Sequence, residues 1–158
     1  MKTHSWKTYV LWILMAEAVG ILSGWLSQDG IRTFGETAVQ PNLSPPAILF
    51  PVVWTVLYAL MGISASRVYL QPLSPERSLG LNLYIIQLIF NFFWSLIFFQ
   101  AKSYGFALIW LLLLWLLVFM MIISFEKTEK TAAILLIPYL IWLTFAAYLN
   151  WSVWRLNR

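Results

Sequence analysis

The charged residues of this chain are confined to short clusters, and this distribution limits its fold more than any other feature. Only 10% of the 158 residues are charged, and uncharged stretches of 30, 24, 23 and 24 residues separate the clusters. These stretches lie between Glu36 and Arg67, Arg77 and Lys102, Lys102 and Glu126, and Lys130 and Arg155. A helix needs about 20 residues to cross the hydrocarbon core of a bilayer. Each stretch is therefore long enough for one transmembrane helix.

A fifth apolar segment runs from Thr8 to Leu26 and carries one charge, Glu17. Two lysines precede it, and Ala16-Glu17-Ala18 has the small-x-small spacing of a cleavage site, so the segment also resembles a secretory signal. The apolar run continues past that point to Leu26, which favours a membrane span. The sequence thus predicts an all-α integral membrane protein, a five-transmembrane-helix bundle.

One membrane domain over residues 1–158 accounts for the whole chain. Backbone groups in lipid must be satisfied within each helix, and the spans are expected at about 6–27, 46–70, 76–100, 103–125 and 130–154. The polar stretch 28–45 is the one long connection, and we expect a loop that is a candidate lid. Ser44 is expected to cap the second span. Pro51 and Pro138 are expected to bend the second and fifth spans.

The sequence excludes most conventional chemistry. It has no cysteine, one histidine (His4) and six carboxylates, of which Glu17 alone falls within a span. No metal site, required cofactor, catalytic triad or phosphate loop is therefore expected, and no ordinary hydrolase or phosphotransferase. The net charge of +4 is spread over all the loops and both ends, which argues against nucleic acid as a partner. The predicted topology puts six basic residues on the same side of the membrane as the N-terminus and four on the other side, which slightly favours a cytoplasmic N-terminus. The six are Lys2, Lys7, Arg67, Arg77, Lys127 and Lys130, and the four are Arg32, Lys102, Arg155 and Arg158.

Glu17 has two readings. A charge at the centre of a bilayer costs about 2.5–3.5 kcal/mol, and such residues are functional by default. The simpler reading is a protonated or hydrogen-bonded acid that faces the bundle. A proton relay would need a second acid or a histidine within the spans, and the sequence contains neither.

Tryptophan is unusually frequent, with ten residues in the chain. Seven are expected at the membrane interfaces (Trp6, Trp25, Trp151, Trp154) or in packing against lipid and neighbouring helices (Trp12, Trp110, Trp115). The other three stand on helix faces that combine large rings with polar groups: Asn91, Trp94, Ser95 and Phe98; Trp54 and Tyr58; Trp142, Ala146, Leu149 and Asn150. Such faces suit a pocket for a flat, mostly apolar ligand. Packing between helices is the alternative reading.

Three motifs on these faces resemble the TspO/MBR family, the tryptophan-rich sensory proteins of bacteria and the mitochondrial translocator (peripheral benzodiazepine receptor) proteins. The first is Phe50-Pro51-Val52-Val53-Trp54-Thr55-Val56-Leu57-Tyr58, and the second is Asn91-Phe92-Phe93-Trp94. The third and most specific is Pro138-Tyr139-Leu140-Ile141-Trp142-Leu143-Thr144-Phe145-Ala146, followed by Leu149-Asn150. With the length and the five spans, the resemblance covers nearly the whole chain.

This resemblance implies a bundle, commonly a homodimer, in a bacterial cell membrane. It implies binding of porphyrins such as protoporphyrin IX and haem, of sterols, and of isoquinoline or benzodiazepine drugs. The cavity residues of the family map onto Trp54, Asn91, Trp94, Trp142, Ala146 and Leu149, with stretch 28–45 as the lid. Some bacterial members degrade protoporphyrin in light and oxygen, and the tryptophans used match Trp54 and Trp142, which are the candidate catalytic residues.

Three positions depart from the family pattern. Leu43 and Trp110 stand where many members have tryptophan and aspartate, and Trp151 replaces the tyrosine of a C-terminal sterol motif. The last change argues against sterol recognition. The leading reading is a membrane receptor or sensor for tetrapyrroles. The alternatives are a transporter of porphyrin or another hydrophobic metabolite, which would usually show inverted repeats, and a stress-linked interaction protein.

Overall fold

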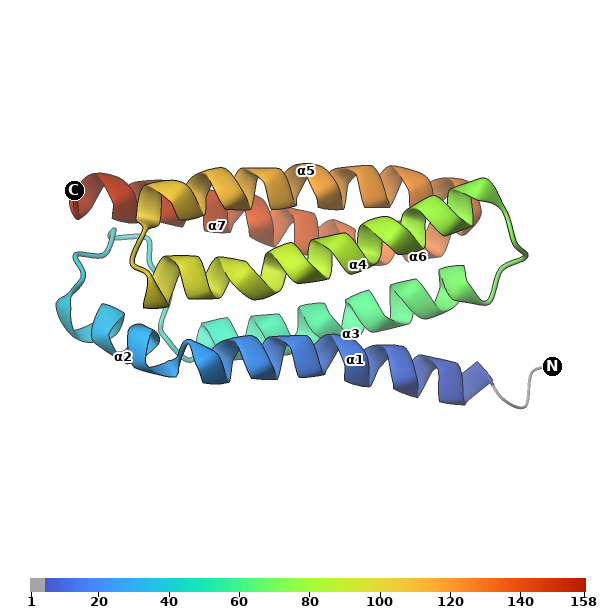
Figure 1. Cartoon of the computed structure of the whole chain (residues 1–158), viewed down its shortest axis with the longest axis horizontal. Helices are drawn as coiled ribbons and strands as arrows, with labels where there is room; N and C mark the ends of the chain where they lie inside the picture. Colours follow the sequence, from blue (N-terminus) through green and yellow to red (C-terminus); the bar gives the residue numbers. More distant parts are fainter. Residues whose placement is uncertain (1–4) are drawn as a thin grey trace.

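A computed structural model describes residues 5–158 as a bundle of long helices that run roughly parallel to one axis (Figure 1). Lys2 and His4 lie outside the described residues. The elements are α1 (Ser5–Leu26), α2 (Gln28–Thr37), α3 (Leu49–Tyr69), α4 (Pro75–Ser95), the π-helix η2 (Leu96–Gln100), α5 (Tyr104–Thr128), α6 (Lys130–Leu135) and α7 (Ile137–Leu156). Five helical stretches are long and apolar enough to cross a membrane, with α4 and η2 forming one and α6 and α7 another. The predicted five-span, all-α architecture is confirmed.

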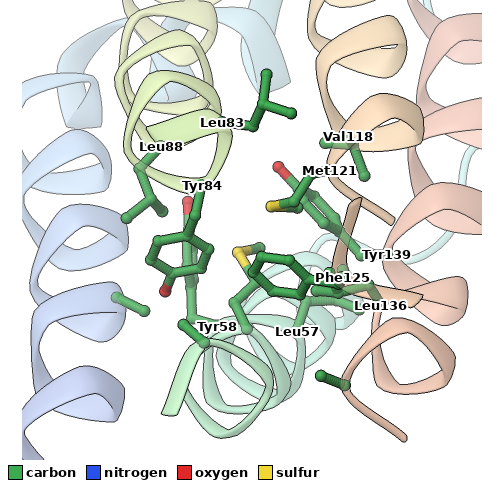
Figure 2. Close-up of a cluster of buried hydrophobic side chains, with 14 of the residues drawn as sticks. Leu57, Tyr58, Leu83, Tyr84, Leu88, Val118, Met121, Phe125, Leu136 and Tyr139 are labelled. Atoms are coloured by element: carbon green, nitrogen blue, oxygen red, sulfur yellow. The ribbon is translucent and has the colours of Figure 1, made fainter. Parts of the chain in front are cut away.

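The helices pack mainly in pairs: α1 against α3, α4 against α5, and α5 against α7 (Figure 1). Their shared core holds large side chains such as Tyr84, Met121, Phe125 and Tyr139, all fully buried (Figure 2). By contrast α1 buries only 11% of its most apolar window, against 28–39% for the other spans. Helix α1 therefore lies at the edge of the bundle, with most of its surface turned to lipid.

Stretch 28–45, which the sequence predicts as a loop, contains a helix. Its Asp and Gly residues suggested turns, but α2 occupies Gln28–Thr37. The buried Gly30 and, one turn later, Phe34 share one face of α2. The Gly30 N–H donates to Gln100 Oε1 at 2.6 Å, and the Phe34 ring packs on the Phe98 ring with centroids 5.3 Å apart. Docking against the end of the third span thus stabilises a helix that local composition did not indicate.

The second span begins three residues later than predicted, and Pro51 does not bend its interior. In the fifth span, where a bend was predicted at Pro138, the helix is interrupted just before that residue. Helix α3 begins at Leu49, after a turn in which the Leu49 N–H donates to the Pro46 carbonyl at 2.9 Å, and Ser44 does not cap it. Pro51 therefore stands in the first turn, where its missing N–H removes no helical bond. Pro138 cannot donate to the carbonyl of Ile134, and the helix is interrupted between α6 and α7.

An ion pair fixes the turn between α5 and α6 to α3. Arg67 Nε donates to Glu129 Oε2 at 2.7 Å, and the same carboxylate accepts the Ala132 N–H at 2.8 Å as the N-cap of α6. The Arg67 guanidinium and these backbone donors hold the pKa of the Glu129 carboxyl below its usual value, although partial burial opposes the shift. Ser64 adds a hydrogen bond to the Ala132 carbonyl at 2.6 Å.

Candidate functional site

A chain of buried hydrogen bonds joins α3, α4 and α7 in the middle of the bundle. The Tyr58 hydroxyl donates to Asn91 Oδ1, and Asn91 Nδ2 donates to the Tyr139 hydroxyl oxygen at 2.8 Å. The Tyr139 hydroxyl in turn donates to Gln87 Oε1 at 2.8 Å. All four side chains are buried. Satisfied polar networks in a low-dielectric interior fix the relative positions of the helices that carry them, and Figure 2 shows Tyr58 and Tyr139 approaching the core from two different helices.

The Tyr58 and Tyr139 rings bracket Trp54. The centroid of the Trp54 ring lies 5.5 Å from that of Tyr58 and 6.2 Å from that of Tyr139. Trp142 completes the group, since its ring lies 6.4 Å from Trp54 at an interplanar angle of 88°. The Trp54–Tyr139 and Trp54–Trp142 pairs are edge-to-face, whereas the Trp54 and Tyr58 rings are tilted by 32°. Edge-to-face pairs at these distances are favourable by about 0.5–1.5 kcal/mol beyond area burial. The hydrogen-bond chain on Asn91 therefore positions the two tryptophans that the sequence singled out.

Trp142 Nε1 is buried and has no hydrogen-bond partner among the described residues. Indole N–H is a donor only, and leaving such a group unsatisfied inside a protein costs about 1–3 kcal/mol. The ring is also wedged against Phe50, with centroids 5.8 Å apart, and Phe145, at 5.6 Å. This N–H is not accessible from the surface, so a ligand acceptor could reach it only after a neighbouring side chain moved.

A groove of about 700 Å³ runs between α3 and α7, and Trp142 forms part of its wall. Its lining is entirely apolar and includes Val53, Val56 and Leu60 of α3 and Ile141 and Phe145 of α7. Val56 is 54% exposed and Ile141 65% exposed. The groove therefore opens on the lipid-facing side of the bundle. Its volume lies within the range of about 300–1,000 Å³ that is usual for small-molecule sites.

Trp94 lies apart from this group, toward α2. Its Nε1 donates to Asn150 Oδ1 at 3.1 Å, and its ring stacks on Phe98 with centroids 5.1 Å apart. Phe98 and Tyr104 also contact the Phe34 ring of α2, with centroids 5.3 and 6.2 Å away. Trp94 packs against both the central core and this second cluster. It therefore connects the central tryptophans to the predicted lid.

The remaining predicted residues follow Trp142 along α7. Ala146 is half-buried against the central core, and Leu149 is buried. The structure thus brings Trp54 and Trp142 into contact and links Asn91 to them through two tyrosines. Sequence reasoning missed Tyr139 and Gln87 as members of the site. Helical spacing offered a signal, because Tyr139 precedes Trp142 by three positions and Gln87 precedes Asn91 by four.

The segment after α2 is tied to the C-terminal end of α7. The Val39 N–H donates to Asn157 Oδ1 at 2.9 Å, and Asn157 Nδ2 donates to the Val39 carbonyl at 2.8 Å. With the Gly30–Gln100 bond, the predicted lid is held at two points across the end of the bundle where α2 and the C-terminus lie (Figure 1).

Glu17 has no hydrogen bond or ion pair within the described part of the chain, and it is half-buried. Gly20, one turn later on α1, lies directly against the Tyr58 ring. Glu17 is therefore near the seam between α1 and α3. A hydrogen-bonded Glu17 therefore has no partner among the described residues, and a protonated Glu17 stays a prediction.

Three other tryptophans pack as expected from the sequence. The Trp110 Nε1 donates to the Phe90 carbonyl at 2.8 Å, and the two rings stack 4.3 Å apart. Trp115 donates to Thr144 Oγ1 at 2.9 Å. Trp12 packs edge-on against Tyr84. Each of these indoles joins neighbouring helices.

The candidate site carries aromatic surface and one free donor rather than acids, bases or metal ligands. Residues 5–158 contain no group of three or more His, Cys, Asp or Glu side chains that could hold a metal ion. Binding a flat apolar molecule is the chemistry that this arrangement supports.

Comparisons with known proteins agree on one family. The profile of the TspO/MBR family matches residues 12–155. The tryptophan-rich protein TspO of Chlorobaculum tepidum is 35% identical over 151 residues, which cover 95% of this chain and 96% of the relative. Protein CrtK of Rhodobacter capsulatus is 41% identical over 119 residues (75% and 74%), and the translocator protein of Ovis aries is 31% identical over 156 residues (97% and 92%). The chain is therefore an integral membrane protein that belongs to the TspO/MBR family, whose members are named as sensory and translocator proteins.

Proposed function

We propose that this protein is a membrane sensor that binds a tetrapyrrole such as protoporphyrin IX against Trp54 and Trp142. Trp142 is the observation that carries the proposal, because it contacts Trp54, lines the groove between α3 and α7, and keeps a buried N–H unpaired. The groove offers apolar walls to a macrocycle. The buried indole N–H would meet one of its acceptors only after a neighbouring side chain moves. Its opening toward lipid suits ligands that dissolve in the bilayer.

Light-dependent degradation of the bound porphyrin is the second part of the proposal. Light and molecular oxygen supply the oxidant, and an indole beside an excited porphyrin is an oxidisable neighbour that phenylalanine does not replace. Trp54→Phe and Trp142→Phe should therefore slow the loss of the porphyrin spectrum more than they weaken binding. Two lost aromatic contacts change affinity by roughly one to two powers of ten together.

The test pairs a dissociation constant for protoporphyrin IX in the dark with a bleaching rate under fixed illumination and oxygen. Trp115→Phe is the matched control, because Trp115 bonds Thr144 away from Trp54 and Trp142. A parent protein that bleaches porphyrin no faster than empty detergent micelles would make the protein a binder only. Unchanged binding and bleaching in both variants would disprove the site.

Translocation is the second candidate function. It is favoured by the side opening of the groove, which gives a ligand access from the bilayer, and by the name of the translocator protein of Ovis aries among the relatives. Porphyrin flux into sealed liposomes that contain the protein distinguishes a translocator from a sensor, which binds without flux.

A further inference from the structure

A second groove, unrelated to the tryptophan site, lies at the opposite end of the bundle from α2. It has a volume of about 230 Å³ and lies between the end of α5 and the α6 helix with the start of α7. Ile122 and Ile123 of α5 and Ile134 and Ile137 of the facing segment provide its apolar lining. Ile134 is 56% exposed, so the groove opens to the surroundings of the bundle.

Both walls of this groove carry a charge at the same end. Glu126 follows Ile122 by four positions on α5, and Lys130 precedes Ile134 by four positions on α6. With a rise of about 1.5 Å per residue, each charge stands about 6 Å nearer the end of its span than its apolar neighbour. The groove therefore has an anion and a cation at its mouth and hydrocarbon below them, at the boundary between spans α5 and α6–α7.

These two charges have no protein partner. Neither Glu126 nor Lys130 takes part in a hydrogen bond or ion pair with another described residue. The neighbouring Glu129 differs, because Arg67 and the first turn of α6 already occupy its carboxylate. A carboxylate and an ammonium group that line the same largely apolar groove thus remain available.

We propose that this groove binds a phospholipid of the phosphatidylethanolamine class. Its primary ammonium would donate to the Glu126 carboxylate, its phosphate would accept from Lys130, and the first part of an acyl chain would cover Ile123, Ile134 and Ile137. This occupant carries both charges that the mouth of the groove complements. Phosphatidylglycerol lacks the cation and would set its phosphate beside Glu126. Phosphatidylcholine has a cation without N–H donors. The inference is independent of tetrapyrrole binding.

The test measures retention of dioleoyl-phosphatidylethanolamine, -phosphatidylcholine and -phosphatidylglycerol by the delipidated full chain, using native mass spectrometry of an equimolar mixture. The parent should bind the ethanolamine lipid at least about threefold more tightly than the other two, the scale of one exposed ion pair. Glu126→Gln should remove this preference, and Lys130→Gln should weaken all three lipids. Ile134→Trp should do the same by filling the groove.

Arg32→Gln is the control, because Arg32 pairs with Asp29 on α2 at the other end of the bundle. It should leave all three affinities unchanged, and circular dichroism should show equal helix content in every variant. Equal retention of the three lipids by the parent would overturn the proposal. So would tightest binding of phosphatidylglycerol, which basic residues alone would produce, or a preference for the ethanolamine lipid that survives Glu126→Gln.

Discussion

At the scale of single residues, Asn91 determines the geometry of the tryptophan site. Its amide accepts from Tyr58 and donates to Tyr139, and these two rings bracket Trp54. The sequence placed Asn91 on the same helix face as Trp94 and suggested a ligand contact, which stays a prediction. It did not reveal the tyrosine partners, because spacing along one helix does not show which residue of another helix it meets.

Replacing Asn91 with leucine should therefore loosen the site as well as the fold. Asn91→Leu leaves the Tyr58 hydroxyl without its acceptor and the Tyr139 hydroxyl without its donor, at roughly 1–2 kcal/mol in stability. We expect a lower thermal midpoint in detergent and weaker porphyrin binding. Tyr58→Phe, which removes one donor and keeps the ring, should lose less of both. A thermal midpoint for Asn91→Leu equal to that of the parent would show that the network does not stabilise the bundle.

At the scale of elements, α2 and the segment that follows it are tied to the end of the bundle, and their role as a lid stays a prediction. Asn157 holds the Val39 backbone by two hydrogen bonds, each worth about 0.5–1.5 kcal/mol. Asn157→Ala should shift the lid toward opening, so that porphyrin association and dissociation both accelerate by roughly five- to tenfold while the dissociation constant changes little. Stopped-flow quenching of tryptophan fluorescence measures both rates.

Asn42→Ala is the control for this change, since Asn42 lies in the same segment and makes no hydrogen bond with another described residue. It should leave both rates unchanged. If Asn157→Ala alters neither rate, the segment does not gate the site.

The existence of α2 itself was not predictable from the sequence. Asp29-Gly30 and Gly35 are typical of turns, and the helix is explained only by the contacts of Gly30 with Gln100 of η2 and of Phe34 with Phe98.

Spans were the most predictable elements. Long uncharged stretches in a bilayer leave few alternatives to a helix, and the predicted boundaries lie within about three residues of those in the structure at every end. The two prolines were less predictable. Pro138 stands at an interruption of its helix, where a bend was predicted. Pro51 falls in the first turn of α3, because this helix begins at Leu49, three residues after Pro46. The predicted cap at Ser44 did not reveal this later start.

At the scale of the whole molecule, the proposed function requires a five-helix bundle of the TspO/MBR family to present Trp54 and Trp142 to a tetrapyrrole. The charged groove was not predictable from the sequence, because spacing along α5 and along α6 does not show which of their side chains face each other. The groove at Trp142 lies between α3 and α7, with Trp54 outside its lining, and the charged groove lies between α5 and the α6 helix with the start of α7. The sequence named Trp142 as a candidate site residue, which stays a prediction, and its unpaired N–H is visible only in three dimensions.

Mapping photo-oxidised tryptophans by peptide mass spectrometry tests this claim most directly. The protein is loaded with one equivalent of protoporphyrin IX, illuminated briefly in air and digested, and the oxidation of each tryptophan is followed against time. Oxidation should begin at Trp54 and Trp142, well ahead of Trp110, Trp115 and the exposed Trp6 and Trp25. If the exposed tryptophans oxidise first, as porphyrin dissolved in the surrounding detergent would cause, the tetrapyrrole does not bind at Trp54 and Trp142.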